Sequence, residues 1–138
     1  MAALRALASS PLLSRPAFLL CLSALLVHEM DAVREREWTG LFPFSLIKDD
    51  EAAHRVFTGV HVPLYAGLLW LFARRDGRAH AAASVLSAFA VGHAGAHAYF
   101  RYREWLGFRS GFSKALIWGA ALCGAADLGL ARLAAARK

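Results

Sequence analysis

Four histidines and one aspartate are the residues of this chain best suited to chemistry, because they interrupt stretches that are otherwise apolar. His28 and Asp31 are three residues apart and His93 and His97 are four apart, so each pair lies on one face of a helix. His61 lies in a further apolar stretch. Imidazole and carboxylate groups are the ligands that zinc and related first-row divalent metals prefer. These five residues are therefore the predicted ligands of a divalent transition metal such as zinc.

Nearby carboxylates are candidates for the surroundings of such a site. Glu29 points about 100° away from His28 around a helix, so we expect it, or Glu37, to support the ligands from outside. If the chain is a metal-dependent enzyme of hydrolase type, Glu29 or Asp31 is the candidate base that activates a bound water. The H-E-x-x-H pattern of zinc proteases is not formed, because residue 32 is alanine. The sequence therefore decides for neither an enzyme nor a binding protein.

Four apolar segments have to position these side chains, and each is close to the ~20 residues that span a bilayer as a helix. We expect helices over residues 16–33, 52–73, 79–100 and 113–130. The short connection after the second segment makes the second and third helices antiparallel neighbours. The expected fold is an all-α, four-helix transmembrane bundle whose helices run up, down, up and down, as a single domain over residues 1–138.

The direction of each helix decides which polar groups share a layer of the bundle. With ~1.5 Å of rise per residue, the predicted ligands of the first and third helices lie near the ends of those helices, and His61 lies early in the second. All of them therefore fall in the same half of the bundle. Asp127, late in the fourth helix, falls in the opposite half and is not expected in the site.

The composition is typical of a membrane protein, with 58% hydrophobic residues and a mean hydropathy of +0.41. The net charge of +6 comes from basic residues that flank the apolar segments, where they meet lipid headgroups, so the expected partner is the lipid bilayer. Tyr102 and Trp105 are expected at headgroup level as well. No zinc-finger, helix-turn-helix or aromatic RNA-binding pattern is present, so nucleic acid is not an expected partner. The 16 Lys and Arg residues divide equally between the two ends of the bundle and predict no membrane orientation.

Other interpretations of the histidine layer remain open alongside the metal site. In one, imidazole and carboxylate groups are hydrogen-bond partners of each other in a structural polar core, and the protein is a non-enzymatic membrane component. In another, two histidines from different helices bind a haem, which makes the chain an electron-transfer subunit. A role in proton relay is the remaining alternative.

Short motifs along the chain resemble a known family. They are His28-Glu29-x-Asp31-Ala32, Glu37-Trp38, His61-x-Pro63, His93-x-x-x-His97, and Phe108 with Ser113 before the last helix. Together they look like a family of small bacterial four-helix integral membrane proteins of unknown function. The resemblance implies an uncharacterised four-helix integral membrane protein, and it brings no activity, substrate or cofactor with it. The expected location of the chain is the bacterial inner membrane.

Overall fold

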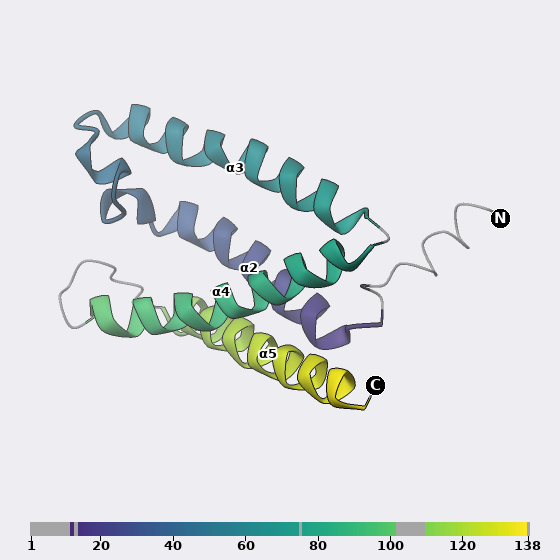
Figure 1. The fold of residues 1–138 in the computed structure, drawn as a ribbon. Coiled ribbons are helices and arrows are strands. Elements are labelled where there is room, and N and C mark those ends of the chain that lie inside the picture. The colour runs from purple at the N-terminus through teal and green to yellow at the C-terminus, as the bar shows by residue number, and fades with distance from the viewer. Residues whose placement is uncertain (1–11, 13, 75, 102–109, 138) are drawn as a thin grey trace.

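Four long helices make up most of the chain in a computed structural model, which describes residue 12 and residues 14–74, 76–101 and 110–137. The long helices are α2 (Pro16–Arg34), α3 (Asp50–Phe72), α4 (Gly77–Arg101) and α5 (Gly111–Ala136), and two short 3-10 helices, η1 (Glu37–Thr39) and η2 (Phe44–Leu46), lie between α2 and α3. The prediction of an all-α, four-helix fold is confirmed. Successive long helices run in alternating directions (Figure 1). Tyr102, Trp105 and Phe108 lie outside the described residues.

The helices begin where the sequence supplies suitable first-turn groups. α2 begins with Pro16, whose missing N–H costs nothing in the first turn of a helix. Asp49 precedes α3, and its side chain accepts a hydrogen bond of 2.7 Å from the N–H of Ala52. Ser110 caps α5 in the same way, at 2.9 Å from the backbone nitrogen of Ser113. Local sequence therefore determines where these three helices start.

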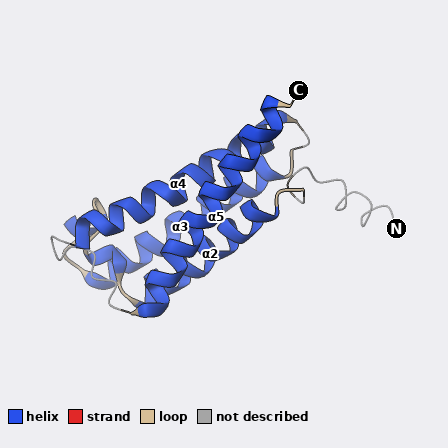
Figure 2. Cartoon of the chain, turned by 90° about the horizontal axis from the view of Figure 1, so that it is seen from below, coloured by secondary structure: helices blue, strands red, loops and turns tan. Residues whose placement is uncertain are grey.

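Small buried side chains let α2, α4 and α5 pack closely. Cys21 and Leu25 of α2, Ala90 of α4 and Ala120 of α5 form one buried cluster. Small residues at helix contacts allow the backbones to approach, which is the usual basis of helix packing in membranes. In Figure 2 the four helices run along a common direction, as expected for a bundle.

Most side chains of α3 face outward. Only Ala53 and Phe57 are buried among its residues, and they pack against Ala32 and Trp38 at one end of the helix. The helix continues through Pro63 to its end at Phe72. Large apolar side chains on its outer surface, which suit contact with lipid rather than water, are Val62, Leu64, Leu69 and Trp70.

Three of the long helices, α2, α3 and α5, are long and apolar enough to cross a membrane, judged by length and composition within the described residues. α4 has 25 residues but is not among them. Its alanines, glycines, serines and histidines are less apolar than leucine or valine, so α4 is the least apolar of the four long helices. One face of α4 is instead covered by its neighbours, through Ala79, Ala83, Ser87, Ala90 and Ala94.

Gly124 lies where α5 passes directly against the backbone of α4, and this contact can be tested. A Cβ atom at Gly124 would lie 2.6 Å from the carbonyl oxygen of Ser87, which is closer than these atoms can approach. Gly124→Ala should therefore displace α5 from α4 and lower the free energy of unfolding by roughly 1–3 kcal/mol. The measurement is the melting temperature of the purified protein in detergent.

Gly119→Ala is the matched control, because nothing lies within 4 Å of its Cβ position and alanine raises helix propensity by about 1 kcal/mol. This variant should melt at or above the temperature of the parent. Equal melting temperatures for the two variants would contradict the close contact.

Candidate metal centre

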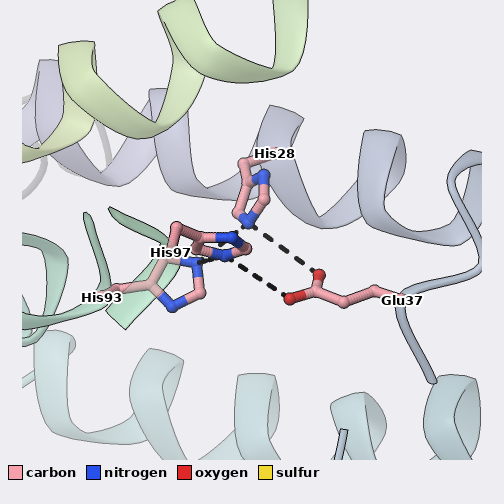
Figure 3. A group of neighbouring side chains, drawn as sticks. All are labelled: His28, Glu37, His93 and His97. Carbon is pink, nitrogen blue, oxygen red and sulfur yellow. Dashed lines mark hydrogen bonds and ion pairs between the residues drawn. The ribbon is translucent and has the colours of Figure 1, made fainter. Parts of the chain in front are cut away.

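Three histidine rings and one glutamate converge beside α2 and α4 (Figure 3). Nε2 of His93 lies 2.9 Å from Nε2 of His28 and 3.0 Å from Nε2 of His97. Glu37 completes the group, with Oε1 3.5 Å from Nε2 of His97 and Oε2 4.0 Å from Nε2 of His28. One ligand atom from each of the four residues lies within 4.8 Å of those of the others. The structure thus brings together three of the five predicted ligands.

The histidines meet because of their spacing and the direction of their helices. His93 and His97 lie one turn apart on α4, and their ring centroids are 4.4 Å apart. His28 lies toward the end of α2 and is fully buried, with its ring centroid 5.0 Å from that of His93. Phe89, one turn before His93, stacks on the His93 ring at 5.3 Å. The group therefore has an apolar ring on one side.

Glu37 reaches the histidines because the chain reverses direction after α2. Arg36 has φ 57° and ψ 46°, a left-handed conformation that costs a non-glycine residue roughly 1–2 kcal/mol. Immediately after it, η1 turns the side chain of Glu37 inward, where it is 6% exposed. A loop residue therefore provides the carboxylate of the group.

Asp50, the first residue of α3, stabilises this reversal. Its Oδ2 lies 2.6 Å from Nη2 of Arg36, and its Oδ1 accepts a hydrogen bond of 3.1 Å from Nε1 of Trp38. The Trp38 ring is itself buried against Ala32 and Phe57. The residues on both sides of Glu37 are thus attached to α3, and this attachment keeps the carboxylate in place.

Burial changes the acidity of Glu37. Removal from water, and the nearby negative charge of Glu29, raise the pKa of Glu37 to about 8. At neutral pH the carboxyl group of metal-free protein is therefore mostly protonated. A bound cation would displace that proton, because metal ligands act in their deprotonated form.

Asp31, a predicted ligand, lies outside the group. Its Oδ1 accepts a hydrogen bond of 2.9 Å from Nε of Arg34, and its Oδ2 accepts one from the hydroxyl of Ser113. It therefore joins the end of α2 to the start of α5. The spacing of three residues predicted that Asp31 lies on the same helix face as His28. In the structure α5 lies beside Asp31, and Ser113 of α5 is its partner. The carboxylate of the group is Glu37 instead.

His61, another predicted ligand, is also placed elsewhere. Its Nε2 lies 3.0 Å from Oε2 of Glu29, and its Nδ1 lies 2.8 Å from the carbonyl oxygen of Phe57. His61 was expected in the same layer of the bundle as the other histidines. The orientation of α3 turns its ring toward Glu29 on α2 and not toward α4. Glu29 was expected to support the histidines of the group, and it pairs with the His61 ring instead.

Glu37 was expected only as a supporting residue, since its position depends on a loop that periodicity does not describe. The available signal was the Glu37-Trp38 pair, in which a large aromatic beside an acidic residue indicates a loop that folds back onto the bundle. Asp127 lies at the opposite end, as its place in the last helix implies. Its carboxylate accepts hydrogen bonds from Arg15 at 2.9 and 2.6 Å and from Ser87 at 2.7 Å.

Residues 15–134, most of the chain, match a family of unknown function, DUF6713. The chain belongs to this family. Neither a curated protein nor a solved structure matches it. The four residues of the group all lie within the part of the chain that defines its membership of DUF6713.

In this member of the DUF6713 family, three imidazoles and one carboxylate form a donor set that zinc accepts. Bonds of ~2.0–2.1 Å separate neighbouring ligand atoms by ~3.3 Å around a tetrahedral ion and by ~3.0 Å around an octahedral one. Four contacts in the group run from 2.9 to 4.0 Å, close to both values, and one ligand atom from each residue lies within 4.8 Å of the others. Small side-chain shifts would therefore accommodate an ion.

The protonated state of Glu37 predicts how stability depends on pH in metal-free protein. Its folded pKa is about 8 and its ordinary value is 4.5, so the folded chain binds more protons than the unfolded chain between these values. The contribution of Glu37 to the free energy of unfolding is fully present below pH 4.5 and is lost as the pH rises through about 8. The size of this contribution is on the order of a few kcal/mol. Glu37→Gln should remove this dependence.

The measurement is the melting temperature with a chelator present, from about pH 5 to about pH 9. Glu51→Gln is the control, since that side chain is 64% exposed and pairs with Arg55 on the surface of α3. A parent whose melting temperature follows that of Glu37→Gln over the whole range would show that Glu37 is not a buried acid.

Proposed function

We propose that this protein is an integral membrane protein, of the bacterial inner membrane, that binds one divalent transition-metal ion such as zinc. Its ligands are His28, Glu37, His93 and His97. Three observations support the proposal: the contacts of His93, the completeness of the donor set, and the apolar surfaces of the helices.

The contacts of His93 carry the metal assignment. A ring nitrogen offers either one N–H or one lone pair, and both lie in the plane of the ring. Nε2 of His93 has two ring nitrogens within 3.0 Å, those of His28 and His97, and it cannot form a conventional hydrogen bond with both at once. A cation shared by the three lone pairs satisfies all three nitrogens. This favours a metal over a purely structural network of hydrogen bonds.

The same separations favour a bare metal ion over haem. Two histidines on opposite sides of a haem iron, each at about 2 Å, have their nitrogens about 4 Å apart with the flat macrocycle between them. The Nε2 atoms here are 2.9 and 3.0 Å apart, with the carboxylate of Glu37 in the same group. A compact ion suits this geometry.

Four protein ligands are the pattern of structural metal sites, in which the ion holds parts of the chain together. The ion would join α2 and α4 to the loop that carries Glu37. This supports a binding and stabilising role. Of the two candidate bases, Asp31 is paired with Arg34 and Ser113, and Glu29 is paired with His61, so neither faces the group.

Insertion into a bilayer is supported by three apolar helices and by the outward-facing Leu and Val side chains of α3. α4 crosses the membrane as the less apolar helix of the bundle, because α5 and α2 cover one of its faces. The interior pairs also fit a membrane bundle, because polar side chains of membrane proteins commonly hydrogen-bond between helices.

Zinc content tests the metal proposal directly. Parent protein purified in detergent, loaded with zinc and passed through a desalting column should retain one equivalent by elemental analysis. His93→Ala removes the central ligand and should lower affinity by more than about 100-fold, because loss of an outer-shell contact alone costs 10- to 100-fold. His80→Ala is the matched control on the same helix, since that side chain is exposed and lies outside the group. Zinc retained equally by His93→Ala and the parent would contradict the site.

Extraction behaviour tests membrane insertion. Membranes from cells that express the protein are washed with alkaline carbonate, which releases proteins held only at the surface. The parent should stay in the pellet and dissolve only in detergent, because its helices bury apolar surface in lipid. Release into the carbonate supernatant would show that the helices lie on the membrane rather than in it.

A further inference from the structure

A second polar pair lies between α2 and α3, outside the four-residue group. Nε2 of His61 lies 3.0 Å from Oε2 of Glu29, and the two side chains are 18% and 27% exposed. Glu29 follows His28 in the chain and points about 100° away from it around α2. Consecutive residues of one helix therefore face two different places: His28 faces the buried group and Glu29 faces α3.

Hydrogen bonding decides which nitrogen of His61 carries a proton. Nδ1 lies 2.8 Å from the carbonyl oxygen of Phe57, which can only accept, so Nδ1 donates. In a neutral ring, Nε2 then holds a lone pair, and this lone pair faces the carboxylate oxygen of Glu29 at 3.0 Å. Two acceptors at this separation require a cation between them, which is either a proton or a metal ion.

The surroundings of the pair favour a metal ion. A histidine whose other ring N–H is held by a backbone carbonyl has the usual arrangement of a metal ligand, because that contact sets the tautomer and the orientation of the ring. The 3.0 Å separation suits a hydrogen bond, and it is equally the ~3.0 Å expected between neighbouring ligands of an octahedral ion with bonds of ~2.1 Å. Both side chains are partly exposed, so packed protein atoms do not fill the remaining positions of such an ion.

We propose that Glu29 and His61 bind a second divalent first-row transition-metal ion, with water completing its coordination. This site shares no ligand with the buried group. It offers two protein ligands where the buried group offers four, so its ion binds more weakly and exchanges with solution. The rings of Phe57 and Tyr65, at 5.0 and 5.5 Å from the His61 ring, flank the site.

Calorimetric titration of the full chain with Zn²⁺ tests the second site. The protein is purified in detergent and freed of metal with a chelator beforehand. The parent should take up one tight and one weaker equivalent. Glu29→Gln and His61→Ala should each lose the weaker equivalent and keep the tight one, and the exposed His80→Ala control should keep both.

Each other outcome is decisive. A single tight equivalent, unchanged in His61→Ala, means that a proton bridges the pair; it overturns the second site and leaves the first intact. Loss of both equivalents in His61→Ala makes the pair a support for the buried group, which also overturns the second site. A single equivalent that is lost in His61→Ala and kept in His93→Ala upholds the second site and overturns the four-residue centre. No uptake by the parent overturns both.

Discussion

Polar groups buried between apolar helices need partners, and this requirement ties the helices of the chain together. A buried donor or acceptor left without a partner costs about 1–3 kcal/mol. Four polar pairs inside this bundle join different helices, and together they set the position of each helix along its neighbours. The pairs are His28 with His93, Asp31 with Ser113, Glu29 with His61, and Asp127 with Ser87.

The candidate metal centre depends on this register and on one loop. α2 and α4 bring the histidines to the same depth, but they supply no carboxylate to the group. Glu37 arrives from a reversal that includes a left-handed Arg36, and the contacts of Asp50 with Arg36 and Trp38 stabilise that reversal. An ion bound to Glu37 would connect the reversal to both helices. The loop and the helices are therefore parts of one arrangement.

α2 has a central place because adjacent residues on it face different neighbours. His28 points to the buried group, Glu29 to His61 on α3, and Asp31 to Ser113 on α5. The buried group is closed by four side chains, and the Glu29–His61 pair is partly open. These differences in exposure suit a tightly held ion in one place and an exchangeable ion in the other. They follow from the packing of α3, most of whose side chains face outward.

The sequence by itself determined the all-α fold and the meeting of His28, His93 and His97, because hydrophobic runs and helical spacing are local properties. It also separated Asp127 from the site through helix direction. Only the tertiary structure decided that Glu37, and neither Asp31 nor His61, stands beside the three rings. Rotation of α3 about its axis, the position of α5 beside Asp31 and the reversal at Arg36 arise from contacts between distant segments. Periodicity reports the depth of a side chain in a bundle, but not which neighbouring helix or loop it meets.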